Sequence, residues 1–295
     1  MSDVMRAWLA FMFLLAAPCL ASGKEEAGAI AAVDEWLEIP IPDQTQREER
    51  LVWEYAANYS PLSWYVFRRG HTLAASPEAS RPRSPRPPFL PAEGKRADGI
   101  VAQRIDDGWL VAFNHGEFGA ELSWFSEDGK ENRKISIHHV VEFVRWQGKW
   151  HAIEGLAHLG SSRGSLIELD RSQGAWQTRT VTQLPAAPSA VSAKANGNLL
   201  ITLSDSLVEL EPDGRLRILL ADAPWMGLYA TSSIWDEETG TLYIGMRQYV
   251  ARYEIATSTL AMLIPSRAFL HRLAPDQERG VRRQATLMGT HLWSD

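Results

Sequence analysis

The chain has 295 residues, a formal net charge of −6 at pH 7, twelve tryptophans and one cysteine. This length suits one large domain or two smaller ones. The acidic balance argues against a general DNA- or RNA-binding protein, because neutralising phosphates requires clustered Lys and Arg side chains.

Residues 1–23 are typical of a secretory signal peptide. A short segment with one arginine precedes an apolar run of 11 residues, Ala7 to Ala17, which is too short to span a bilayer comfortably. Pro18 ends this run, and small residues follow at the cleavage positions. We therefore expect a periplasmic or secreted protein with no transmembrane span after cleavage.

Cys19 is the only cysteine of the chain. If it is acylated, the protein is a lipoprotein, but Pro18 stands where such signals need a small residue. Conventional cleavage instead leaves no disulfide and no thiolate nucleophile or metal ligand. An exported protein of this kind depends on a large core for its stability.

Between residues 24 and 75 the pattern is mixed. Ala27 to Leu37 has some helical spacing, which the prolines at 40 and 42 end. Two aromatic runs follow, LVWEY from Leu51 and LSWYVF from Leu62, and both are typical of strands. We expect them to form an incomplete first sheet.

Residues 76–91 hold six prolines and three arginines without apolar periodicity. This composition predicts an extended, exposed loop, and a docking motif for a proline-recognising partner is the alternative. The segment before it is too short for a core of its own. We therefore expect residues 24–295 to form a single domain.

From Asp98 to Ser266 one pattern recurs four times: a turn with glycine, an apolar strand, a polar segment and a second strand. The glycines are Gly108, Gly148, Gly197 and Gly240, which lie 40, 49 and 43 residues apart. This is the period of a four-stranded propeller blade. The sequence therefore predicts an all-β propeller of five to seven four-stranded blades, about six, with one or two degenerate.

Other strands of the predicted blades follow from the positions of these turns. We expect innermost strands at 99–104, 140–146, 189–194 and 229–235, and outer strands at 176–181 and 216–220. The tryptophans are most simply explained by packing between blades. Residues 266–295 offer one way to close the ring, by pairing with strands from residues 51–73.

Polar segments interrupt the repeats where the second strand of a blade turns into the third. In a propeller these loops and the links between blades emerge on one face, which would gather the segments 114–117, 154–163, 204–205 and 247–248. The candidate ligand-binding residues on this face are Asn114, His115, Glu117, His158, Arg163, Tyr229 and Arg247. Arginine and carboxylate groups over an aromatic floor of Trp225 and Tyr229 would suit a sugar or peptide. The alternative is that these residues only form turns and pack blades.

Catalytic motifs are scarce in this sequence. It contains no HExxH, Gly-rich phosphate loop, GxSxG or paired-cysteine metal site. Glu117 and Glu154, in corresponding segments of adjacent blades, would be an acid/base pair for glycoside cleavage if they converged. His115, Glu117 and His158 would need similar convergence to hold a metal, so we predict neither a metal nor a cofactor.

The runs FNHGEFGAELSWF, EGLAHLGSSRGSLIEL and GTLYIGMRQYVARYE resemble a group of exported bacterial β-propeller proteins without an assigned activity. The resemblance covers about residues 88–265 and implies fold and compartment, with no catalytic residues to transfer. Together these patterns favour a binding module without catalysis, an envelope scaffold or inhibitor that holds an envelope protein or a polar small ligand. The alternative is a glycan- or peptide-directed hydrolase or lyase on the same face.

Overall fold

The computed structural model describes residues 31–282 apart from 43–44, 59, 61, 78–85, 91–98, 172–173, 274, 276 and 280. The predicted signal peptide, Cys19 and most of the Pro/Arg segment lie outside the described residues. So do residues 283–295 at the end of the chain.

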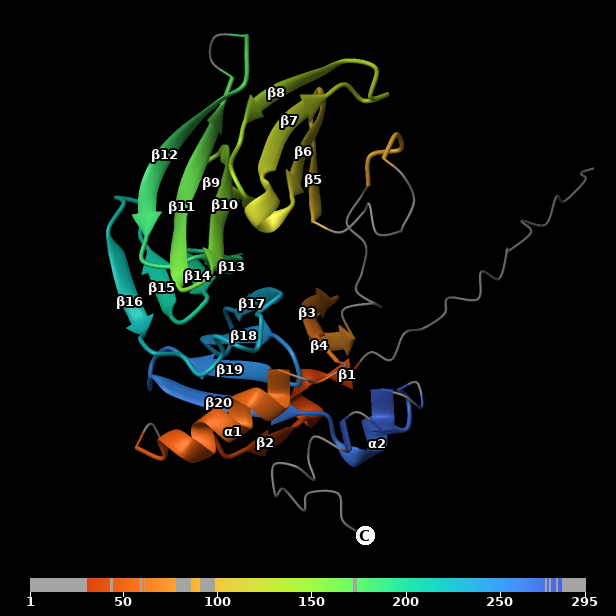
Figure 1. Ribbon diagram of the computed structural model, residues 1–295, viewed down its shortest axis with the longest axis vertical. Coiled ribbons are helices and arrows are strands. Elements are labelled where there is room, and N and C mark those ends of the chain that lie inside the picture. Colours follow the sequence, from red (N-terminus) through yellow and green to blue (C-terminus); the bar gives the residue numbers. More distant parts are fainter. Residues whose placement is uncertain are drawn as a thin grey trace, which may run out of the picture.

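The middle of the chain forms three consecutive four-stranded antiparallel sheets, which lie at the top and left of Figure 1. The first contains β5 (Ile100–Ile105), β6 (Gly108–Asn114), β7 (Ala120–Phe125) and β8 (Asn132–Ser136). The second contains β9 (Val140–Trp146), β10 (Lys149–His158), β11 (Ser161–Asp170) and β12 (Gln177–Leu184). The third contains β13 (Pro188–Ala193), β14 (Leu199–Leu203), β15 (Leu207–Leu210) and β16 (Leu216–Leu220).

Two further sheets contain both ends of the described chain. One is built from β17 (Ser232–Asp236), β18 (Thr241–Gly245), β19 (Val250–Glu254) and β20 (Thr259–Ile264), with β2 (Leu37–Ile39) as a fifth, outer strand. The other has the order β1 (Ala31–Ala32), β4 (Thr72–Pro77), β3 (Trp64–Arg69). Short helices complete the fold: α1 (Arg47–Asn58), α2 (Arg267–Leu270), η1 (Val33–Glu35) and η3 (Gly116–Phe118).

The sheets are arranged as the blades of a propeller. Their first strands pack against one another in the order β5, β9, β13, β17, β3. A sheet between two neighbours buries both faces, so its middle strands are mostly apolar, and β14 and β15 are buried along their whole length. The all-β propeller prediction is confirmed, and the five sheets of the described residues fall at the lower end of the predicted range.

The repeated glycines lie in the turns between the first and second strands of their blades. Gly148 and Gly197 have φ of 75° and 87°, a left-handed conformation that glycine adopts without steric cost. The strands predicted next to these turns are confirmed. The predicted strand 140–146 coincides with β9, and the predicted outer strand 216–220 coincides with β16.

The region before the blades differs from the predictions in two places. LVWEY is not a strand but lies in α1, where Arg50 pairs with Glu54 one turn later and Trp53 and Ala57 are buried on one side. The helical spacing of 27–37 does not produce an α-helix either, since β1, η1 and the start of β2 occupy its described part. LSWYVF does form a strand, β3.

An early strand and a late strand of the described chain pair in a way that the sequence did not indicate. β2 pairs with β20, with Leu37 opposite Ile264. Residues after β20 do not extend the sheet in their described part but fold into α2, which buries Phe269 and Leu270. Aromatic rings fill this junction, because Trp36 packs edge-on against Trp64 at 4.7 Å and Trp53 stacks on Tyr249 at 4.9 Å.

Candidate functional site

The topology divides the propeller into two faces. We call the loop face the one formed by the loops between second and third strands together with the links between blades. Its segments are 115–119, 159–160, 204–206 and 246–249, with the links 137–139, 185–187 and 221–231. The turns between first and second strands and between third and fourth strands form the opposite face, which we call the turn face.

Three predicted site residues meet on the loop face between the β5–β8 and β9–β12 blades. His158 and Glu117 form an ion pair across the two blades. Asn114 Oδ1 accepts a hydrogen bond from the backbone N–H of Gly116 at 3.0 Å and lies 3.3 Å from Nδ1 of His139. These contacts fix the 115–119 loop against the neighbouring blade. His115 is exposed at the start of the same loop.

The predicted polar segment 154–163 is not a loop. It continues β10 and β11, whose turn consists of Leu159 and Gly160 alone. Glu154 is therefore a buried strand residue that accepts a hydrogen bond from Ser165. The expectation that Glu117 and Glu154 occupy corresponding positions is wrong, because Glu117 lies in η3 and Glu154 inside a sheet.

His139 connects the buried and exposed parts of this junction. Burial lowers the pKa of its imidazole, and the positive charge of Arg163 lowers the pKa further, against the opposing effect of Glu154. Arg163 lies on β11 directly opposite Leu156 and is itself exposed. The sequence-predicted Arg163 thus acts electrostatically on the same junction as Asn114.

Two other predicted residues meet at the β17–β20 blade. The guanidinium of Arg247 lies over the ring of Tyr229, 4.4 Å from its centroid. Arg247 Nη1 also donates to the backbone oxygen of Asn58 at 2.9 Å and to its Oδ1 at 2.7 Å, which holds the end of α1 on the loop face. Trp225 cannot serve as an aromatic floor, since it is buried and donates its Nε1–H to Leu203.

The seven predicted residues therefore belong to two groups at different blade junctions. Asn114, His115, Glu117, His158 and Arg163 form one group, and Tyr229 and Arg247 form the other. Within the described residues, no three His, Cys, Asp or Glu side chains are arranged to hold a metal ion.

The loop face carries a set of exposed apolar side chains, of which the sequence reasoning identified only Tyr229. They are Phe118 (86% exposed), Leu159 (92%), Ile137 (69%), Met226 (66%) and Tyr229 (57%). Apart from Tyr229, each stands in a loop or link beside a polar or glycine residue, as Phe118 does between Glu117 and Gly119. An isolated apolar residue in a polar loop was the signal that could have identified them.

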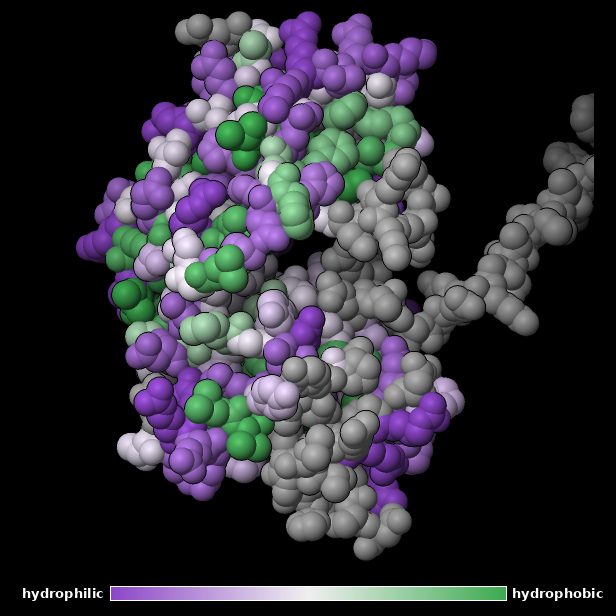
Figure 2. Space-filling model, in the orientation of Figure 1, coloured by the Kyte–Doolittle hydropathy of each residue, from purple (hydrophilic) through white to green (hydrophobic). Residues whose placement is uncertain are grey.

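The turn face has a different composition. Its turns are made of residues such as Asp106, Asp107, Gln147, Asn196 and Glu237 next to glycines. Outside the loop face and α1, the described chain has two exposed large apolar residues, Leu37 and Ile218. Both belong to outer strands rather than to turns. The view in Figure 2 shows hydrophilic surface interrupted by separated apolar patches.

A second missed residue is Glu142 on β9. Its Oε2 accepts a hydrogen bond from the backbone N–H of Val191 on the innermost strand of the next blade, at 3.1 Å. Burial raises the pKa of this carboxyl to about 7, although the hydrogen bond acts in the opposite direction. Nothing in the sequence distinguishes Glu142 from the other acidic residues.

Comparisons with known proteins identify no family. No protein-family model matches the chain, and no curated protein matches it. Among solved structures, a streptogramin B lyase is 17% identical with a TM-score of 0.40, covering 58% of this chain and 56% of its own. A gluconolactonase from Xanthomonas campestris is 14% identical with a TM-score of 0.39, covering 65% and 64%. TolB from Acinetobacter baumannii is 13% identical with a TM-score of 0.33, covering 48% and 37%.

The matched regions span less than two thirds of each of these three proteins. The likenesses are distant, and no role passes from them to this chain. No helix among the described residues has the length and apolar character needed to cross a membrane.

Proposed function

We propose that this chain is an exported propeller that binds a partner protein through its loop face and performs no chemistry, as an envelope scaffold or inhibitor. The observation that carries the proposal is the set of protruding apolar side chains on that face, Phe118, Leu159, Ile137, Met226 and Tyr229. The predicted signal peptide supports a periplasmic or secreted location.

The composition of the loop face supports a protein interface. Aromatic residues, Met and Arg are enriched in the buried centre of protein–protein interfaces, and this face presents Phe118, Tyr229, Met226 and Arg247. Large apolar side chains in water are favourable to bury, at about 25 cal/mol per Å² of apolar surface. A contiguous apolar patch in soluble proteins marks a contact surface, and the loops of this face supply five exposed apolar side chains from which one could form.

Local contacts hold these residues in place before a partner arrives. The Glu117–His158 ion pair fixes the loop that carries Phe118, and the Arg247–Tyr229 stack fixes the link that carries Met226. A preorganised surface loses less conformational entropy on binding than a mobile one. The polar residues predicted as ligand contacts therefore support the apolar contact residues.

The shape of the surface favours a protein over a small ligand. Small-molecule sites are concave and enclose most of the ligand. Phe118 and Leu159 project from their loops with 86% and 92% of their surface exposed, so they are suited to entering pockets of a partner.

A hydrolase would require Glu117, Glu154, His158 and Arg247 around one cleft. Glu154 is instead buried against Ser165 within the β9–β12 blade. Arg247 is bound to Asn58 and Tyr229 at the other junction. Because no observation favours catalysis over binding, we do not propose an enzymatic activity.

We expect substitutions at Phe118 and Leu159 to weaken partner capture without unfolding the protein. Leu159 has φ of 46°, a conformation that Asn tolerates, so Leu159→Asn removes the apolar contact without strain. Phe118→Asp adds a charge to an exposed position. Each change should weaken the affinity for the captured partner by about tenfold or more.

The measurement is crosslinking and affinity capture from envelope extract, followed by a binding titration with the purified partner. Ile218→Asp is the matched control, because Ile218 is equally apolar and 58% exposed but lies on the outer strand β16. Equal capture by the wild type and both loop-face variants would reject the proposal, as would consistent failure to recover any partner.

A further inference from the structure

The turn face carries a groove that the proposed function does not use. It has a volume of about 540 Å³ and is lined by Arg104, Ile105, Asp106, Arg145 and Trp150. These residues come from the ends of β5 and β9 and the start of β10, where two adjacent blades present their first turns. The volume lies within the usual range for small-molecule sites, about 300–1,000 Å³.

The groove is built from the same arrangement in two neighbouring blades. Arg104 lies directly opposite Trp109 in the β5–β6 pair, and its guanidinium lies over the indole at 6.0 Å. Arg145 lies directly opposite Trp150 in the β9–β10 pair, at 5.3 Å. Stacking on an indole fixes the plane of a guanidinium while leaving its N–H groups free to point outward. Both arginines are therefore oriented before a ligand binds.

The two arginines differ in their remaining contacts. Arg104 Nη2 is paired with Glu127 at 2.9 Å. Arg145 forms no ion pair with any carboxylate in the described part of the chain, and it is exposed. A guanidinium without a carboxylate partner in the described part of the chain offers a donor pair that matches the two oxygens of a ligand carboxylate.

We propose that this groove binds a small monocarboxylate that also carries a hydrogen-bond donor. The carboxylate binds Arg145, with Arg104 on the opposite wall. Asp106 accepts a hydrogen bond from a hydroxyl or ammonium group of the ligand, and Ile105 and Trp150 contact its carbon skeleton.

The charge of the groove selects this ligand class. Arg104 is already paired with Glu127, so the lining leaves one cation, Arg145, for a single carboxylate and one anion, Asp106, for a donor group. A polyanion would meet Asp106 and a chain of net charge −6. A neutral sugar would leave the Arg145 guanidinium without a counter-charge.

Hexuronates and α-amino acids with an uncharged side chain both have this chemistry. Both carry one carboxylate, and they differ in whether the donor facing Asp106 is a hydroxyl or an ammonium. Asp106→Asn removes the negative charge but keeps an acceptor oxygen. It should therefore weaken the binding of an amino acid strongly and that of a hexuronate only slightly.

The test is isothermal titration of the full chain with glucuronate, leucine, glucose and inorganic phosphate in parallel. We expect one of the two carboxylates to bind with a Kd of about 1 mM or lower, and Arg145→Gln to weaken it about tenfold. Arg145→Lys should lose affinity as well, since it keeps the charge but not the paired donors. Arg133→Gln is the matched control, because Arg133 also lies opposite a tryptophan, Trp124, but outside the groove.

Several results would overturn the proposal. One is the absence of binding by both carboxylates up to about 10 mM. Others are equal binding of phosphate and carboxylate, or unchanged affinity in Arg145→Gln. Thermal unfolding of each variant verifies that the fold is retained. Because the groove lies on the turn face, failure here leaves partner capture by the loop face unaffected.

Discussion

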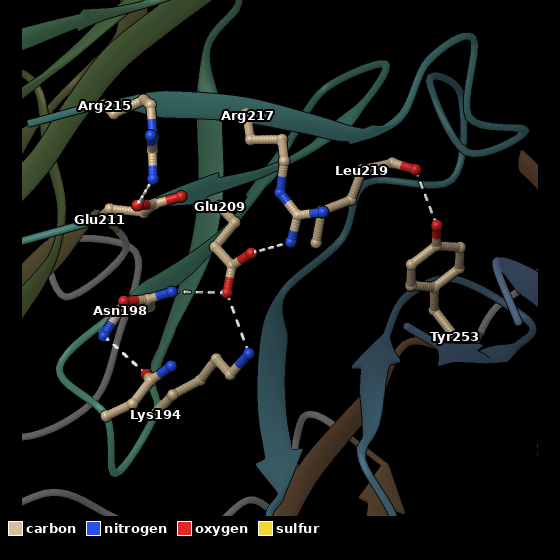
Figure 3. A network of polar contacts seen from close by, with 9 residues as sticks. Lys194, Asn198, Glu209, Glu211, Arg215, Arg217, Leu219 and Tyr253 are labelled. Atoms are coloured by element: carbon tan, nitrogen blue, oxygen red, sulfur yellow. Dashed lines mark hydrogen bonds and ion pairs between the residues drawn. The ribbon is translucent and has the colours of Figure 1, made fainter. Parts of the chain in front are cut away.

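Replacing Glu209 with glutamine is expected to lower the free energy of unfolding by about 3 kcal/mol at pH 7. Glu209 lies on β15 with 2% of its surface exposed. Its Oε1 accepts hydrogen bonds from Asn198 and Lys194, both at 2.9 Å, and its Oε2 pairs with Arg217 (Figure 3). Burial alone would raise the pKa of this carboxyl, but the hydrogen bonds from Asn198, Arg217 and Lys194 hold it at about 2. Glutamine keeps the shape and removes the charge, which leaves Lys194 without its counter-ion.

Urea unfolding at several pH values measures this effect. The pKa falls from 4.5 in the unfolded chain to about 2 in the folded one, so the stabilisation is present above pH 4.5 and is lost as pH falls through 2. The wild type and Glu209→Gln should therefore converge in strong acid. Glu211→Gln is the control, because Glu211 pairs with the exposed Arg215 in the same view and should change stability by less than about 1 kcal/mol. A similar loss in both variants would contradict the argument.

The neighbouring blade uses the same construction. Glu168 on β11 is buried, with Lys149 at 2.8 Å and Arg179 at 2.9 Å. The hydrogen bond from Lys149 holds the pKa of this carboxyl below its usual range, with a further contribution from Arg179. The matching sequences LIEL and LVEL in the two repeats therefore repeat a buried, ion-paired glutamate as well as apolar residues. Blade stability depends on these buried carboxylates in addition to apolar packing.

The blades could be predicted from the sequence because local and global signals agree there. Glycine turns recur at Gly108, Gly148, Gly197 and Gly240, and each precedes an apolar strand that both neighbouring sheets bury. The region before residue 75 lacks this agreement. LVWEY has strand-forming residues, but the charges of Arg50 and Glu54 and the burial of Trp53 against Tyr249 favour a helix.

The candidate site was predictable only as a face. Topology places Asn114, Glu117 and His158 on the same side of the propeller, and the structure joins them across one junction. The structure places Arg247 at another junction. The hydrogen bonds from Arg247 to Asn58 depend on where α1 packs, and no local sequence pattern indicates that packing. The Arg–Trp pairs were visible as the spacing of five from Arg104 to Trp109 and from Arg145 to Trp150. That the two members of each pair are in contact could be inferred only from the strand register, which places each arginine directly opposite its tryptophan.

Glu142 is expected to reduce stability as the pH rises, and Glu142→Gln should remove this loss. The carboxyl lies between two innermost strands, where burial raises its pKa from 4.5 to about 7. Its contribution is fully present below pH 4.5, where the unfolded chain is also protonated, and it is lost as pH rises through 7. A shift of this size corresponds to about 3 kcal/mol between the two limits. The amide oxygen of glutamine can still accept the N–H of Val191.

Urea unfolding from pH 4 to pH 9 measures the difference in unfolding free energy between the wild type and Glu142→Gln. Taking this difference isolates Glu142 from every other titrating group. The difference should be small near pH 4.5 and should favour the variant by up to about 3 kcal/mol at pH 8 and above. Glu238→Gln, at an exposed turn position, is the control and should change stability by less than about 1 kcal/mol. If the curve for Glu142→Gln is flat, the carboxyl is not desolvated in the folded protein. If the curve slopes the other way, the ionised carboxylate has a stabilising partner. Glu142 would then resemble Glu209 and Glu168, and alkaline pH would not weaken its contact between blades.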